Sequence, residues 1–271
     1  CDRPTAPFLG FVAAMATSAA AFAVPPATID AWVPGGKLTV AGNVTETVRS
    51  GWRYGFAIAM NDRYAVIGAP DTPLKRSNGS VVNGAGSAYV FKRTPGTDTW
   101  TFEQRLIAPE LSLCQTGCAV AIDPQNDDII VGAWGYGGAA TFAGGAFVYA
   151  KDLASDSWGV ATTIPSTGND TRMPSQELLP ADLQAIDQFG FSVALDHGTA
   201  VVGAPLSGSS NTGAAYVFVR NGGGTYEQKQ KLTDPAGGGN DQLGTKVAIS
   251  GNLVAAGIQN DDVYGKVNAG R

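Results

Sequence analysis

The feature that most constrains the fold of this chain is a pair of glycines that recurs four times at nearly constant spacing. The second glycine of each pair follows the first by 13 residues in three units and by 15 in the other. The pairs are Gly55 and Gly68, Gly117 and Gly132, Gly190 and Gly203, and Gly244 and Gly257. Such self-similarity is typical of repeat proteins, in which each unit needs its neighbours to bury its apolar face.

Each complete unit carries patterns typical of four short β-strands. In the third unit, residues 200–204 are apolar throughout, as expected of a strand covered on both faces. Residues 226–232 are mostly polar instead and suit an exposed edge. The third and fourth strands of the three units are expected at residues 86–91 and 100–106, 145–149 and 158–164, and 213–218 and 226–232.

These patterns predict an all-β fold, a β-propeller of four-stranded blades, because radial repetition leaves only short strand edges exposed. The composition agrees with this class. Only 15% of the residues are charged and 36 are Gly, whereas a helical bundle or coiled coil is rich in Glu, Lys and Leu and poor in Gly. A hydrophobic content of 44% also excludes a disordered chain.

The order of motifs within a unit resembles the FG-GAP repeat family. The third unit has Phe-Gly, a short hairpin, Gly-Ala-Pro, and then an Ala-Tyr-Val-Phe strand. The motif residues are Gly55, Gly68, Ala69, Pro70, Gly117, Gly132, Phe189, Gly190, Gly203, Ala204, Pro205, Gly244 and Gly257. The second unit departs with Thr116 before its first glycine and Trp134 in place of the proline, and the fourth has Ile258 after its second glycine. The family includes the propeller of integrin α subunits and many secreted bacterial and algal proteins.

The repeats divide the chain into expected segments. These are a signal peptide at 1–23, a linker and closing strand at 24–50, and repeat units at 51–114, 115–186, 187–240 and, in part, 241–271. Residues 32–38 resemble the last strand of a unit whose other strands are absent, and Arg271 falls inside an expected strand. We therefore expect about four blades of an incomplete ring, which the integrin resemblance implies has seven. A closed ring of four blades is the alternative.

The N-terminal segment has the pattern of a secretory signal. Residues 8–23 are uncharged and end in Ala-Phe-Ala, an A-x-A cleavage site. The stretch is short and Pro25 follows closely, so we expect no stable membrane span, with a retained anchor or surface helix as the alternative. Because the chain begins at Cys1 rather than Met, the signal is expected to be clipped. The predicted location is secreted, either extracellular or at the cell surface. Glycosylation sequons, usable only in a eukaryotic host, occur at Asn43, Asn78 and Asn169.

Cys114 and Cys118 lie four residues apart. In an oxidising compartment they would close a small disulfide loop, but so short a loop demands special backbone geometry. Two thiols are the equally weighted alternative. No second cysteine pair exists to complete a zinc site.

Integrin-like propellers often hold calcium in a short acidic loop between two strands, and the resemblance raises that expectation here. The corresponding hairpins lack the alternating acidic pattern. The one with enough oxygen ligands contains Asp123, Asn126, Asp127 and Asp128. We predict no cofactor and a solvated turn there, with calcium as the weaker alternative. Asp187 and Asp241 precede two first glycines in register, and we expect them to cap turns by accepting backbone N–H bonds.

The sequence predicts no catalytic residues, and therefore not an enzyme. The only histidine, His197, falls in a short turn between expected strands, and no nucleophile elbow is present. Residues 135–140 have a G-x-G-x-x-A form, but no helix pattern follows, so a dinucleotide site lacks its structural context.

A net charge of −5 argues against nucleic acid as a partner. Trp52, Trp134, Tyr136 and Phe142 lie in or beside inter-strand loops. They either pack between blades or gather on one face, where they would contact sugars or a protein. We predict a secreted, non-enzymatic propeller that mediates extracellular binding or adhesion to a protein or glycan. The alternatives are a propeller module of a larger secreted hydrolase and a structural cell-surface protein.

Overall fold

The computed structural model describes residues 51–75, 79–97, 99–109, 113–138, 140–162, 171–262 and 267–270. All of them belong to one compact unit, Gly36–Arg271. The predictions of a signal peptide at 1–23, a linker and closing strand at 24–50, and sequons at Asn43, Asn78 and Asn169 lie outside the described residues.

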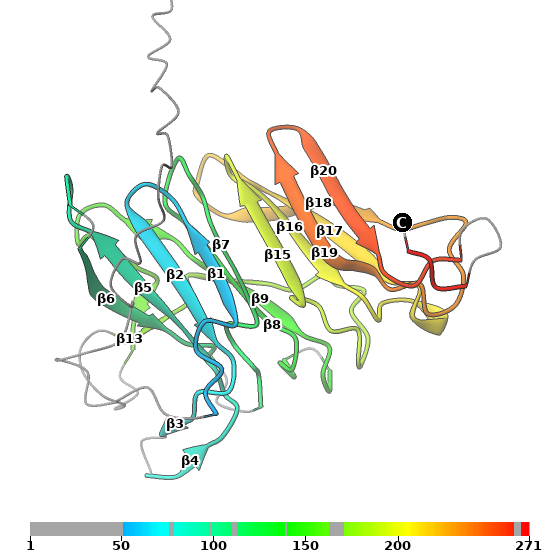
Figure 1. Ribbon diagram of the computed structural model, residues 1–271, viewed down its shortest axis with the longest axis horizontal. Helices are drawn as coiled ribbons and strands as arrows, with labels where there is room; N and C mark the ends of the chain where they lie inside the picture. Colours follow the sequence, from blue (N-terminus) through cyan, green and yellow to red (C-terminus); the bar gives the residue numbers. More distant parts are fainter. Residues whose placement is uncertain are drawn as a thin grey trace, which may run out of the picture. The chain divides into compact units, whose positions relative to one another are not determined.

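The described residues form antiparallel sheets that follow the repeat (Figure 1). Blade 1 contains β1 (Ala57–Met60), β2 (Tyr64–Ala69), β5 (Ser87–Arg93) and β6 (Trp100–Leu106). Blade 2 contains β7 (Ala119–Ile122), β8 (Ile129–Ala133), β9 (Gly145–Tyr149) and β14 (Gln176–Leu178). Blade 3 contains β15 (Ser192–Asp196), β16 (Thr199–Ala204), β17 (Ala214–Arg220) and β18 (Tyr226–Leu232). Blade 4 is described by β19 (Leu243–Ser250) and β20 (Leu253–Ile258).

The expectation of an all-β fold built from four-stranded units is confirmed. Two shorter strand pairs lie in connections within the blades. They pair β3 (Leu74–Lys75) with β4 (Val81–Val82), and β10 (Lys151–Asp152) with β11 (Ser157–Trp158). Two further strands, β12 (Val160–Ala161) and β13 (Thr171–Met173), extend the sheet of blade 1, where β13 runs parallel to β6. The one helical element among the described residues is a 3-10 turn at Ser209–Asn211.

The prediction that residues 158–164 form the fourth strand of the second unit is wrong. The fourth strand of blade 2 is β14, which pairs with β9. The reason is Trp158, which is fully buried against blade 1. Its ring meets Tyr64 edge-on at 4.7 Å, and its indole N–H donates to the carbonyl of Asp127 at 2.7 Å. The chain at Trp158 is thereby directed toward blade 1, and β12 joins that sheet.

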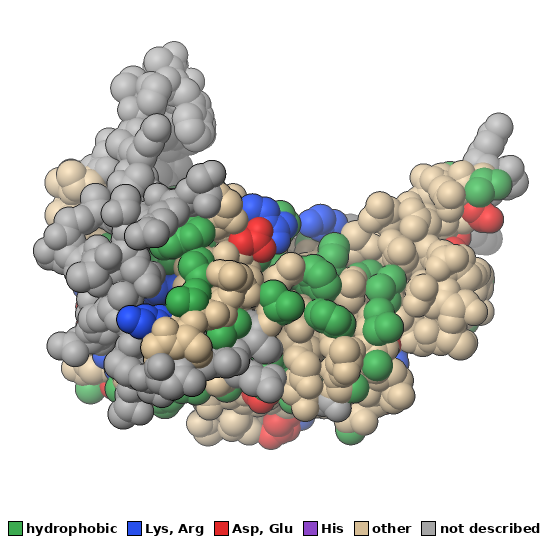
Figure 2. Space-filling model, turned by 90° about the horizontal axis from the view of Figure 1, so that it is seen from below, with side chains coloured by type: hydrophobic (Ala, Val, Ile, Leu, Met, Phe, Trp, Pro, Cys, Tyr) green, Lys and Arg blue, Asp and Glu red, His purple; other side chains and the backbone are tan. Residues whose placement is uncertain are grey.

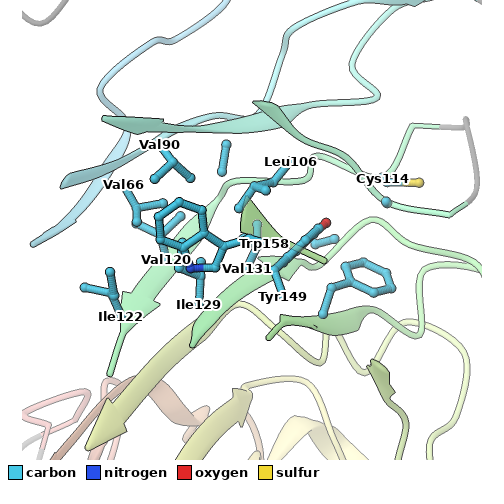
Figure 3. Packing of buried hydrophobic residues seen from close by; sticks show 14 of the residues in the cluster. Val66, Val90, Leu106, Cys114, Val120, Ile122, Ile129, Val131, Tyr149 and Trp158 are labelled. Carbon is cyan, nitrogen blue, oxygen red and sulfur yellow. The ribbon is translucent and has the colours of Figure 1, made fainter. Parts of the chain in front are cut away.

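The blades pack face to face through apolar clusters. Between blades 1 and 2, Trp158 lies among Val66, Val90 and Val120 (Figure 3). A second cluster joins blades 2 and 3, and a third joins blades 3 and 4. Strands β2 and β8 are buried along their whole length, as their uninterrupted apolar sequences predict.

Consecutive blades meet at a glycine-to-glycine contact, hereafter the glycine joint. A Cβ atom built on Gly68, Gly132 or Gly203 would lie 2.0, 2.0 or 1.9 Å from a carbonyl oxygen of the next blade. That oxygen belongs in each case to the first motif glycine of the next blade: Gly117, Gly190 and Gly244. These three glycines have φ angles of +92°, +86° and +92°, a region that other residues rarely adopt. The repeated glycines are therefore required by backbone contacts between blades.

A parallel bridge completes each joint. It pairs Gly86 with Thr116, Gly144 with Phe189, and Gly213 with Leu243. In the second unit the bridging residue is Gly144, so the expected alignment, which placed Gly145 at this position, is offset by one residue. Because a backbone atom of the next blade lies within 2.4 Å of each glycine's Cβ position, no side chain fits there either.

We expect Gly132→Ala to lower the free energy of unfolding by about 3 kcal/mol, because the added methyl group would overlap the carbonyl of Gly190. The matched control is Gly137→Ala in the same blade, where an added Cβ meets no atom within 4 Å. Urea unfolding curves measure both. Equal midpoints for the two variants would contradict the glycine joint.

Acid should weaken a second contact between blades 1 and 2. The carboxylate of Asp156 pairs with Lys92 at 2.5 Å and with Lys151 at 2.6 Å, and hydrogen bonds from Lys151 and Lys92 lower the pKa of Asp156 to about 2. A carboxyl group whose pKa is lower in the folded state than in the unfolded state stabilises the fold at pH values above its unfolded-state pKa. This stabilisation is lost as the pH falls toward 2.

We therefore expect Asp156→Asn to destabilise the protein at pH 7 by about 1 kcal/mol or less, since the side chain is half exposed. The difference from the parent should vanish near pH 2. The measurement is the thermal midpoint across this pH range, with Asp62→Asn, an exposed carboxyl on the β1–β2 hairpin, as the control. A difference that does not change with pH would contradict the prediction.

Candidate functional site

The four calcium-candidate residues lie in the β7–β8 hairpin, and all three carboxylates are buried. Asp123 uses both oxygens on backbone N–H groups. One accepts from Gln125 at 2.7 Å and from Asn126 at 3.2 Å, and the other accepts from Gly198 of blade 3 at 2.6 Å. Asp123 therefore joins its own hairpin to the next one.

Asp127 connects blade 2 to blade 1. Its carboxylate accepts from the side-chain amide of Asn61 at 2.7 Å and pairs with Arg63 at 2.6 Å. Asn126 caps the turn, since its side-chain oxygen accepts from the backbone N–H of Asp128 at 2.9 Å.

Asp128 connects blade 2 to blade 3. Its carboxylate accepts from Arg220 at 2.9 Å, from the hydroxyl of Tyr226 at 3.2 Å and from the backbone N–H of Lys151 at 3.0 Å. Burial raises the pKa of Asp128, and the arginine opposes that rise. A buried charge of this kind is tolerated because it is paired.

These residues do not converge on one point as metal ligands would. In the part of the chain that the structure describes, no group of three or more His, Cys, Asp or Glu side chains could hold a metal ion. The equivalent position of blade 3 is also a connection between hairpins, because Asp196 accepts from Gly251 of blade 4 at 2.6 Å. His197 is an exposed turn residue, as expected, and its ring lies 2.7 Å from Asp196.

Cys114 and Cys118 are both buried thiols that form no disulfide with each other. Cys114 packs in the cluster between blades 1 and 2, at the edge of the view in Figure 3. Cys118 donates instead to the carbonyl of Gly190 at 3.5 Å, and burial raises its pKa to about 11. Of the two alternatives left open by the sequence, the thiols are the one observed.

The candidate aromatic residues have different environments. Trp52 and Tyr136 are buried, and Tyr136 packs edge-on against Phe147 at 5.0 Å. Trp134 is half-buried. Phe142, by contrast, is 40% exposed and is the one that reaches a loop surface. Residues 135–138 and 140 include no helix.

Phe142 lies beside a cavity of about 520 Å³ between blades 2 and 3. The backbone joins the two regions, since Ile186 donates to Thr141 at 3.0 Å and Gln188 to Phe142 at 3.3 Å. We call this cavity the loop site. Its lining residues are Gln184, Ala185, Ile186, Asp187, Leu206, Gly208, Ser209 and Asn211.

The backbone of the loop site is strained. Ile186 has φ +73°, although a β-branched side chain strongly disfavours this region, and the residue is 56% exposed. Ser210 and Asn211 on the facing loop have φ +65° and +56°. Such conformations persist only where surrounding contacts impose them, and they concentrate at functional sites.

Asp187 lies at the base of the loop site and is buried. Its side chain accepts from the backbone N–H of Gln184 at 2.9 Å, which confirms the expected turn cap, and burial raises its pKa. Asp241 caps the backbone N–H of Gly238 in the same way. Between the lining residues Leu206 and Gly208, the hydroxyl of Ser207 lies 3.4 Å from that of Tyr216.

The loop site offers amides, a hydroxyl and a carboxyl together with the apolar side chains of Ile186 and Leu206. Its lining contains no His, Cys or Lys. Sequence reasoning identified Phe142 and Asp187 but missed Ile186 and Asn211, because a positive φ at these positions leaves no local signature.

Comparison with known families locates the repeats. A model described as FG-GAP repeat matches residues 174–218 and 226–271. These two segments are FG-GAP repeats. The first extends from β14 through β17 and contains the whole lining of the loop site, and the second extends from β18 through β20. FG-GAP repeats fold as propeller blades, and the sheets described above have that architecture. A search of curated proteins found no match. The described residues include no helix that is both long and apolar enough to cross a membrane.

We expect calcium to leave the thermal midpoint of this protein unchanged relative to EDTA, because protein donors already occupy the carboxylates of the β7–β8 hairpin. Asp123→Asn should lower the midpoint equally in calcium and in EDTA, since the lost contact is the one to Gly198. Magnesium at the same ionic strength is the control. A rise specific to calcium that Asp123→Asn abolishes would show a metal site instead.

Proposed function

We propose that this FG-GAP propeller is a non-enzymatic binding module that acts outside the cell and recognises a glycan or a protein through the loop site. The observation that carries the proposal is the strained, exposed Ile186 at the mouth of a cavity lined by polar groups. A site with a few placed polar groups and an apolar wall is typical of ligand recognition.

The surface chemistry supports an uncharged ligand. Figure 2 shows one face on which hydrophobic side chains of the described residues gather and their Lys, Arg, Asp and Glu side chains are few. The net charge of −5 likewise gives no support for a polyanionic ligand. Side-chain amides and a hydroxyl, present as Gln184, Asn211 and Ser209, are groups that hydrogen-bond sugar hydroxyls or a peptide backbone.

The pre-set backbone supports binding in a second way. Because the loop conformation is already imposed by contacts with Thr141 and Phe142, a ligand would not have to order it. A site held in a strained conformation gains affinity at the expense of stability, and this trade-off provides a test.

We expect Ile186→Gly to raise the free energy of unfolding by about 1 kcal/mol, because glycine accepts φ +73° without strain. The same variant should weaken binding at least tenfold, because it removes the apolar wall of the loop site. The probe is the labelled 271-residue protein on an array of neutral and acidic glycans, followed by titration of the strongest hit. A panel of extracellular-matrix proteins is screened in parallel.

The matched control is Leu153→Gly, which removes another exposed apolar side chain from the β10–β11 turn. It should leave binding unchanged. If no probe binds, or if Ile186→Gly binds as tightly as the parent, the proposal is wrong.

A further inference from the structure

Blades 1 to 3 share one turn after the second motif glycine. The fourth residue after that glycine donates its backbone N–H to the residue three positions before it, at 3.0–3.2 Å. Its carbonyl accepts at 2.9 Å from the glycine that forms the parallel bridge. The three equivalent residues are Thr72, Tyr136 and Ser207. The turns can therefore be compared position by position.

An aromatic ring fills this turn in blade 2 and is missing from it in blade 3. Tyr136 is 6% exposed and packs edge-on against Phe147. Its ring lies so close to Gly138 that a Cβ atom built on that glycine would be 2.2 Å from it. Blade 3 has Ser207 at the position of the tyrosine, and Ser209, two residues on, lines the loop site. The cavity thus adjoins the place that a tyrosine ring fills in blade 2.

Blade 1 also has a buried aromatic residue beside this turn. The backbone carbonyl of Trp52 accepts from Asp71, just as the carbonyl of Asp187 accepts from Leu206 in blade 3. The indole of Trp52 is buried. Where blades 1 and 2 have a large ring, blade 3 has only the small side chains of Asp187 and Ser207. The cavity of about 520 Å³ that remains there is of the size typical of ligand pockets.

The side-chain amides that line the loop site present acceptors. The amide nitrogen of Gln184 donates to the backbone carbonyls of Asp182 and Leu183 at 3.4 and 3.2 Å. The amide nitrogen of Asn211 donates to the side-chain oxygen of Asn240 at 3.2 Å. Because an amide carries its donors and its acceptor on different atoms, the side-chain oxygens of Gln184 and Asn211 remain as acceptors. A ligand that pairs with them must supply a donor.

We propose that the loop site binds the side chain of a tryptophan or a tyrosine from a protein partner. The ring lies against the apolar side chains of Ile186 and Leu206, and its N–H or O–H donates to the oxygens of Gln184 and Asn211. Both residue types combine a large apolar ring with a hydrogen-bond donor. The choice of an aromatic side chain rests on the proposed function of the loop site, and it selects a protein rather than a glycan as the partner.

An uncharged ring also suits the electrostatics of the lining. The lining residues include no Lys, Arg or His, and the one carboxylate among them belongs to Asp187. That carboxylate already accepts from the backbone N–H of Gln184 at 2.9 Å. Burial of the ring removes its apolar surface from water, which drives the binding.

The test uses four neutral peptides, acetyl-Gly-X-Gly-amide with X as Trp, Tyr, Phe or Leu. Each is titrated into the 15N-labelled 271-residue protein and followed by the backbone amide signals of residues 184–187 and 206–211. The Trp and Tyr peptides should shift these signals at concentrations where the Leu peptide does not. The Phe peptide lacks the donor and should bind about fivefold more weakly than the Trp peptide.

A variant separates the hydrogen bond from simple packing. Gln184→Ala removes one acceptor at an exposed position and should weaken binding of the Trp peptide about fivefold, with no change for the Phe peptide. If Gln184 only supported the loop, both peptides would lose affinity equally. The matched control is Gln228→Ala, at an exposed glutamine of β18, which should leave both affinities unchanged.

Two neutral sugars, N-acetylglucosamine and mannose, are titrated in parallel. If a sugar shifts the loop signals and no peptide does, the aromatic ligand is wrong and the loop site remains a binding site. If neither peptides nor sugars shift them, the aromatic ligand is overturned, and the glycan array and protein panel decide the proposed function separately. Equal affinity for the Trp, Phe and Leu peptides, or equal losses of the Trp and Phe peptides in Gln184→Ala, would also overturn it.

Discussion

The structure depends on a backbone contact that leaves no room for a side chain. At each of the three glycine joints, a carbonyl oxygen of one blade lies 1.9–2.0 Å from the position that a Cβ atom of the preceding blade would take. This approach requires glycine on one side and a positive φ on the other, so both glycines of each repeat are needed for the same physical reason. Once the joints set how closely the blades approach, the faces of β2, β8 and β16 are covered and the apolar clusters form between them.

The acidic hairpin residues reinforce the joints at the other end of the inner strands. Asp123 and Asp196 each accept a backbone N–H from the following hairpin, and Asp127 reaches back to Arg63 of blade 1. Burying these carboxylates is costly unless they are paired, and every one of them has a donor from a neighbouring blade. The carboxylates that resemble calcium ligands in the sequence therefore connect blades in the fold.

The loop site is formed by the connection from β14 to β15 and by the loop between β16 and β17. Backbone bonds to Thr141 and Phe142 hold Ile186 in an unfavourable conformation and leave its side chain at the surface. The blades thus support short loops whose conformation is imposed by hydrogen bonds to neighbouring loops. Such an arrangement suits recognition. The same separation explains why strain at Ile186 is tolerated: the surrounding contacts belong to the joint between blades 2 and 3.

The sequence by itself determined the fold class, most strand positions and the repeated glycines, because strand periodicity and turn residues are local signals. It also placed the caps at Asp187 and Asp241, which bond to backbone only three residues away. Only the tertiary structure decided the fourth strand of blade 2, the partners of Asp123 and Asp128, and the state of Cys114 and Cys118. Trp158, for example, is directed into blade 1 by Tyr64, and Asp128 meets an arginine 92 residues later in the chain. These outcomes depend on which distant side chains share a buried interface, and local sequence patterns do not encode that.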